Sequence, residues 1–186
     1  VSDLAQAAQV ARGTIYNNFQ SIDTLFEDVA TELTLEMEQR VHAELAGKTD
    51  PAIRLVHGLC LCLRRVHEEP VWGRFLLRFG MTTPNLRRIL AGDFADYLKR
   101  GIQSGRFMLA PEQMESVITM ITGVFFASIP MVLEGYHTWR AAGSGMAELL
   151  LRALGLPADE TQALSRIELP PLYPNPPIKN KRALGK

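Results

Sequence analysis

The side chains best suited to chemistry lie close together near the start of the chain, between residues 12 and 18. The guanidinium of Arg12 matches the acceptor edge of guanine, and the amides of Asn17 and Asn18 match the edge of adenine in the major groove of DNA. The hydroxyls of Thr14 and Tyr16 suit phosphate oxygens, which fix the register of a protein on a duplex without reading its sequence. This set predicts a surface that reads double-stranded DNA.

Two short helices joined by a tight turn are needed to present these side chains. Ser2 is placed to cap the first helix, the turn falls at Gln9-Val10 with the valine directed inward, and a second helix follows over residues 11–18. The backbone N–H groups of Arg12 and Gly13, at the start of the second helix, can also approach a phosphate. The alternative is a helical hairpin whose polar residues only face water.

No other set of residues in the sequence predicts catalysis or cofactor binding. There is no Gly-rich phosphate loop and no nucleophile elbow, and His67 with the two glutamates after it lacks the HExxH spacing of a zinc site. His57 and His67 could bind a ligand through hydrogen bonds, but a solvated or capping histidine is the simpler expectation. Cys60 and Cys62 point to different sides of a helix, which predicts buried, reduced thiols and fits the cytoplasm. We therefore expect no enzyme, no cofactor and no metal.

Helical periodicity covers nearly the whole chain and no segment alternates like a strand, so the predicted fold class is all-α. The caps, prolines and glycines predict a long linking helix over 21–47, helices beginning at Pro51, Pro70 and Pro84, and a turn over 101–108. An uncharged helix should follow from Pro111, and Pro130 should kink or break it. After a Gly-rich link over 143–145 we expect an apolar helical stripe that ends at Gly155 and a short last helix over 157–166.

The uncharged helix raises the question of a membrane span. Residues 116–133 carry no charge and approach the shortest length that crosses a bilayer. Its polar residues, and Glu115 and Glu134 where basic anchors are expected, instead favour a buried helix in a soluble dimer. The opening residues VSDLAQAAQV do not have the pattern of a signal peptide.

The net charge of zero hides an acidic first quarter. Residues 1–50 hold three basic and nine acidic side chains, whereas residues 171–186 hold four basic and no acidic ones. Because DNA-binding proteins usually present a basic face, the acidic quarter favours the main alternative, a helical small-molecule binding protein with no role on DNA.

The segment VSDLAQAAQVARGTIYNNFQSIDTLF resembles the DNA-binding head of the TetR family of transcription regulators. Gln9 stands where the family has Gly, Ala11 replaces a capping Ser or Thr at a cost of about 1 kcal/mol, and Ile22 replaces a phosphate-contacting Lys. The resemblance implies that the family's N-terminal arm and first helix are missing, and that basic residues there would offset the acidic quarter. The matching positions are Ala5, Val10, Arg12, Gly13, Thr14, Tyr16, Phe19, Ser21, Leu25 and Phe26.

The resemblance also implies a homodimer held by the last two long helices, and a ligand cavity between the linking helix and the dimer helices. The expected dimer residues, which could instead pack within one subunit, are Gly123, Ala127, Met146, Leu149, Leu150, Ala153 and Leu154. Aromatic and methionine-rich walls suit a large apolar or aromatic effector. The expected cavity residues, each of which also suits plain core packing, are Cys60, Trp72, Phe75, Phe79, Met120, Phe125, Phe126 and Tyr136.

Together these features predict a cytoplasmic regulator with a helix-turn-helix head over 1–46, a ligand-binding and dimerisation body over 47–169 and a Pro-rich basic tail over 170–186. We expect the homodimer to repress transcription at a near-palindromic DNA operator. An effector would release it by swinging the linking helix and changing the spacing of the heads. A helical enzyme and a membrane protein are the remaining alternatives.

Overall fold

The computed structural model describes residues 6, 9–11, 13, 14, 17, 21–82, 84–169 and 172, and for 22–24, 84–91 and 93 only the backbone. Across these residues the fold is helical without strands, which confirms the predicted all-α class. The elements are α3 (Ile22–Glu44), α4 (Pro51–Glu68), α5 (Pro70–Phe79), α6 (Pro84–Gln103), the 3-10 turn η1 (Pro111–Gln113), α7 (Met114–Leu133), α8 (Trp139–Ala153) and α9 (Ala158–Ser165).

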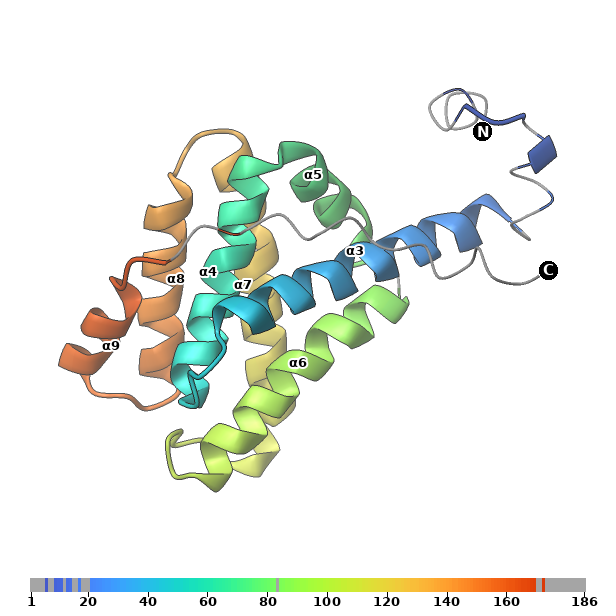
Figure 1. Cartoon of the computed structure of the whole chain (residues 1–186). Helices are drawn as coiled ribbons and strands as arrows, with labels where there is room; N and C mark the ends of the chain where they lie inside the picture. The colour runs from blue at the N-terminus through green and yellow to red at the C-terminus, as the bar shows by residue number, and fades with distance from the viewer. Residues whose placement is uncertain are drawn as a thin grey trace.

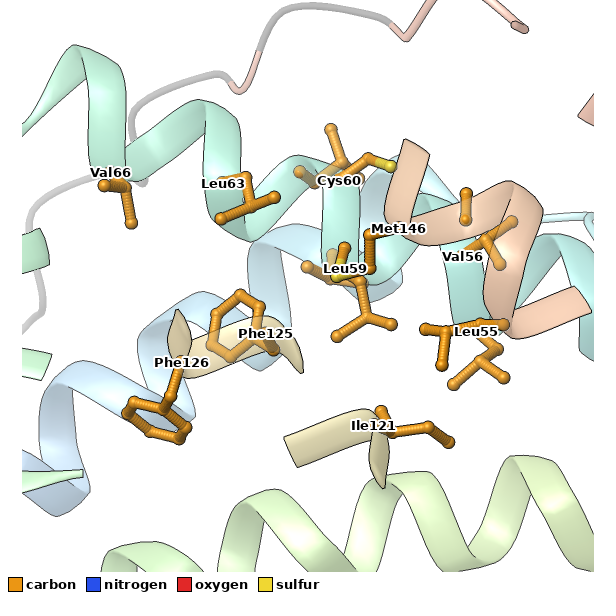
Figure 2. Packing of buried hydrophobic residues seen from close by; sticks show 14 of the residues in the cluster. Leu55, Val56, Leu59, Cys60, Leu63, Val66, Ile121, Phe125, Phe126 and Met146 are labelled. Carbon is orange, nitrogen blue, oxygen red and sulfur yellow. The ribbon is translucent and has the colours of Figure 1, made fainter. Parts of the chain in front are cut away.

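Helix α4 is the centre of the body, because α5, α6, α7 and α8 all pack against it. Its Leu55, Leu59 and Leu63 are buried and point toward Ile121 and Phe125 of α7 (Figure 2). Helix α9 packs on the outer side of α8. Helix α3 packs on α4 and α6, and its N-terminal part extends past the body toward the N-terminus of the chain (Figure 1). The body therefore holds most of α3, and residues as early as Leu25 and Ala30 are already buried.

The helices begin where their capping residues predict. Asp50 accepts a hydrogen bond from the Ala52 backbone N–H at 2.8 Å, and Pro51 occupies the first turn of α4. Thr138 caps α8 through the Ala141 N–H at 3.1 Å. At the other end of this helix, Gly155 has a φ of 86°, a conformation that favours glycine.

Three boundary predictions are wrong. Helix α6 continues to Gln103, so the first three residues of the expected turn over 101–108 are helical. Helix α7 runs through Pro130 to Leu133, so Pro130 does not break it as one of the two expected outcomes had it, because a proline three residues before a helix end removes one hydrogen bond without preventing the last turn. The glycines at 143 and 145 lie inside α8 rather than in a link. Gly143 is needed there for close packing, since a Cβ on it would lie 3.0 Å from the Cys60 sulfur of α4.

The segment Pro111–Leu133 is, within the described residues, the one helix long and apolar enough to cross a membrane by length and composition. Core helices of soluble proteins meet the same criterion. Here α7 packs against α4, α5, α6 and α8, while only 33% of its most apolar stretch is buried inside the chain. The helix thus forms part of the core and also presents an uncharged outer face.

Candidate functional site

A cavity of about 70 Å³ lies among α3, α4, α5, α6 and α7. Helix α3 provides a whole wall of it, with lining residues that recur at three and four positions along one face of the helix. The lining residues are Thr34, Met37, Glu38, Val41 and His42 of α3, Leu55, Gly58, Leu59 and Cys62 of α4, Trp72 and Leu76 of α5, Phe94 and Tyr97 of α6, and Phe125 of α7.

The cavity is mostly apolar, with its polar groups on two sides. On α3, the Thr34 hydroxyl donates to the Ala30 carbonyl at 2.8 Å, and the Nδ1 atom of His42 lies 2.9 Å from the Glu38 carbonyl. On the facing side, the Tyr97 ring lies beneath the Arg54 guanidinium at 5.6 Å. An apolar enclosure with a few polar groups suits a small aromatic molecule that carries hydroxyls.

Next to the cavity, two arginines and two glutamates join α3 to the end of α4. Arg65, whose side chain is only 3% exposed, donates to Glu36 of α3 at 2.7 Å and to Glu69 at 3.1 Å. Arg40 of α3 also pairs with Glu36, and it donates to Glu69 at 3.1 Å. We call these four residues the arginine cluster. The Arg65 guanidinium stacks over the ring of Trp72, with 4.5 Å between its central carbon and the ring centroid.

Two of the aromatic residues expected at the cavity, Trp72 and Phe125, line it. Cys60 instead faces Gly143 of α8, and burial raises the pKa of its thiol to about 12. Phe79 stacks on Phe26 of α3 at 5.2 Å. The other expected residues pack elsewhere: Phe75 lies against Phe79, Phe126 contacts Gly80, Met120 is half-buried against the core, and Tyr136 is 69% exposed.

The sequence analysis expected the linking helix beside the cavity but named none of the α3 residues that line it. Polar residues at 34, 38 and 42, spaced by four beside the apolar Met37 and Val41, were the signal available for it. The two histidines considered as ligand contacts lie away from this cavity. His57 is buried, and burial lowers its pKa despite a hydrogen bond to the Leu164 backbone, whereas His67 is exposed.

The described part of the head agrees with two helices and a turn. Gln6 is helical, and the Gln9 N–H donates to its carbonyl at 3.1 Å. Val10, expected to point inward, is 39% exposed. Gly13, Thr14 and Asn17 are helical and exposed, as a reading helix requires. The remaining residues of the predicted DNA surface lie outside the described residues: Ser2, Arg12, Tyr16 and Asn18.

The residues expected at a dimer interface fall into two groups. Gly123 and Ala127 on α7, and Leu149 and Ala153 on α8, are exposed, and Leu149 is 67% exposed. Met146, Leu150 and Leu154 are buried within the single chain. Only the first group is available to a partner.

Comparison with known proteins gives consistent results. The profile described as "Bacterial regulatory proteins, tetR family" matches residues 1–29, and the profile described as "Tetracyclin repressor-like, C-terminal domain" matches residues 50–166. No curated protein matches the sequence. The chain is similar to the crystal structure of RolR in complex with the ligand resorcinol, with 25% identity and a TM-score of 0.77 over 93% of this chain and 85% of RolR. It is also similar to RolR without ligand, with 26% identity and a TM-score of 0.74 over 92% and 88% of the two chains.

Proposed function

The chain belongs to the tetR family of bacterial regulatory proteins, and we propose that it is a repressor. The position of its cavity supports release from DNA by a small aromatic effector. The observation that carries the proposal is that one helix, α3, leads from the head and also forms a wall of the cavity. A molecule that enters the cavity therefore touches the helix that sets the position of the head.

The cavity size supports a ligand with a single ring. Its volume of about 70 Å³ is below the ~150 Å³ of an engineered cavity that holds benzene, so the walls must separate slightly to admit one. This favours a smaller effector than the large one expected from the aromatic composition. RolR, which shares the fold, binds resorcinol, a benzene ring with two hydroxyls. Three lining residues, Tyr97, Glu38 and His42, carry polar groups of the kind that bind such hydroxyls.

Release then follows from geometry. A symmetric dimer reads two half-sites about 34–36 Å apart, or multiples of that distance, so a shift of a few ångströms in head spacing prevents both heads from binding together. We expect the ligand to bind more tightly when the wall formed by α3 has moved outward. The difference between its affinities for the shifted and unshifted protein then sets how far the population moves toward the shifted one.

The dimer in this proposal forms through the exposed uncharged face of α7 and the exposed positions Leu149 and Ala153 of α8. Covering these faces with the same helices of a second copy would bury the apolar surface that α7 leaves exposed. The proposal therefore places the protein in solution in the cytoplasm, as expected of a DNA-binding regulator, rather than in a membrane.

Selection of a duplex from a random pool tests the DNA-binding part. The chain should enrich a near-palindromic sequence and bind it with strong salt dependence. Tyr16→Phe and Asn17→Ala should each weaken this binding, the latter by about tenfold or more if its amide contacts a base. Gln39→Ala, which removes an exposed amide from α3, is the matched control. Unchanged binding by both head variants would refute the assignment of the reading helix.

Titration with resorcinol tests the ligand. We expect it to change the fluorescence of Trp72, with Trp139 replaced by Phe so that a single tryptophan reports. Tyr97→Phe should weaken binding about fivefold by removing a hydroxyl partner. Tyr136→Phe, at an exposed position away from the cavity, should bind as the parent does. No binding of resorcinol by the parent would exclude this effector class.

A further inference from the structure

The arginine cluster touches both the wall of the cavity and the helix that leads to the head. Arg65 stacks on Trp72, which lines the cavity, and donates to Glu36 of α3. We propose that Arg65 is the positioning residue that transmits occupancy of the cavity to α3, an inference that rests on the function proposed above.

Burial makes this link tight. With 3% of its side chain exposed, Arg65 has little access to water, and its charge is balanced by Glu36 and Glu69. Loss of one partner of a buried ion pair is strongly unfavourable because the remaining charge is left uncompensated. The planar guanidinium also fixes the orientation of its hydrogen bonds relative to the ring on which it stacks. When Trp72 is displaced, Arg65 and Glu36 must therefore move together or exchange partners.

The cluster contains the means for such an exchange. Glu36 and Glu69 each accept from both Arg40 and Arg65, so the two arginines share the same two carboxylates. The Nε atom of Arg40 is buried and has no hydrogen-bond partner in the described part of the chain. This donor can take up a carboxylate oxygen that Arg65 releases, so the cluster can adopt a second paired arrangement with α3 in a different position.

A second contact joins α5 directly to α3, closer to the head than the arginine cluster. Phe79, near the C-terminal end of α5, stacks on Phe26 with 5.2 Å between the ring centroids. Phe26 lies in the second turn of α3, near the N-terminal end that connects to the head. Movement of Trp72 therefore reaches α3 by two routes. Arg65 passes it to Glu36 in the middle of α3, and Phe79 passes it to Phe26 near the start of α3.

A double-mutant cycle tests the link without a ligand. Trp72→Leu removes the ring on which Arg65 stacks, and Glu36→Gln removes the carboxylate charge of α3 that pairs with Arg65. Because both act through Arg65, we expect the Tm change of the double variant to differ from the sum of the single changes by about 2–4 °C. Glu32→Gln, at an exposed position one turn earlier on α3, should combine additively with Trp72→Leu. If Trp72→Leu does not fold, Trp72→Phe takes its place. Additive behaviour of Trp72 and Glu36 would overturn the proposal.

A second experiment separates this inference from the proposed function, with resorcinol as the probe. In the parent, resorcinol should weaken binding to the selected duplex by about tenfold or more. Glu36→Gln should bind resorcinol within about threefold of the parent, by Trp72 fluorescence, but its duplex binding should respond at least fivefold less to resorcinol. An unchanged response would overturn the role of Arg65. A parent that does not respond at all would contradict the proposed function, and the double-mutant cycle would still decide the inference.

Discussion

Gln9 occupies the left-handed region of the backbone, with a φ of 55°, in the turn between the two helices of the head. A side chain in this region is disfavoured by about 1–2 kcal/mol, because its Cβ approaches the following carbonyl oxygen, and glycine avoids the contact. Gln9→Gly should therefore stabilise the head by about 1 kcal/mol. Slower amide hydrogen exchange in the head would show this effect. Gln6→Gly, at a helical position, should have the opposite effect, and faster exchange in Gln9→Gly would contradict the strain.

Two glycines of α6 should respond oppositely to the same substitution. A Cβ on Gly101 would lie 2.0 Å from the ring of Phe107, which is 4% exposed, so the buried ring or the helix backbone would have to shift. Gly101→Ala should destabilise the protein by about 1–3 kcal/mol. A Cβ on Gly92 meets nothing within 4 Å, so Gly92→Ala should stabilise it by about 0.5–1 kcal/mol. Denaturant unfolding measures both changes in the free energy of unfolding. Equal changes for the two variants would show that the Phe107 ring moves aside without cost.

At the scale of elements, Arg106 joins the turn after α6 to the start of α4 and to α9. Its guanidinium donates to Asp50 at 2.9 Å and to Glu160 at 2.5 Å. Burial opposes ionisation of Asp50, but the hydrogen bonds from Arg106 and the Ala52 N–H together lower the pKa of its carboxyl below the ordinary value of 3.8. Asp50 therefore contributes stability that is present above its ordinary pKa and is lost as the pH falls through its lowered pKa in the folded protein.

Asp50→Asn isolates this ion pair, because asparagine caps a helix about as well as aspartate does. At pH 7 the variant should be less stable than the parent by about 1 kcal/mol, since the pair is partly exposed. The difference should shrink below about pH 4. Chemical denaturation from pH 7 to pH 3 measures it. Asp96→Asn, exposed on α6, is the control, and a difference that persists unchanged at pH 3 would contradict the role of the charge.

The same elements show what the sequence can and cannot predict. Asp50-Pro51 and Gly155 have local roles as caps and terminators, so the ends that they set were predicted correctly. Gly143 acts through a contact with Cys60, a residue 83 positions away, and local sequence rules therefore misread it as a link. The part of the cavity lining that α3 provides was missed for the same reason. Trp72 and Phe125 were expected in it because they are large and aromatic, whereas Thr34 and His42 lie in it only because α3 crosses α4 and α6.

At the scale of the whole molecule, a second copy is expected to cover the outer faces of α7 and α8. Leu149 is 67% exposed on α8, and the small exposed residues Gly123 and Ala127 of α7 and Ala153 of α8 leave room for close approach of another helix. A buried carboxylate without a partner strongly disfavours an interface. Leu149→Glu should therefore convert the dimer into monomers, measured by sedimentation. Val71→Glu, which places the same charge at a 74% exposed site on α5, should remain dimeric.

The consequence for DNA follows from the number of half-sites. One reading helix contacts only a few base pairs, so a monomer loses most of the binding free energy that two linked heads gain from high effective concentration. Leu149→Glu should weaken binding to the selected duplex by about 100-fold or more, while resorcinol still binds each cavity with the parent's affinity because the wall of α3 lies within one chain. Duplex binding that survives in a protein shown to be monomeric would mean that the two heads act independently. In that case a change in head spacing could not be the means of release.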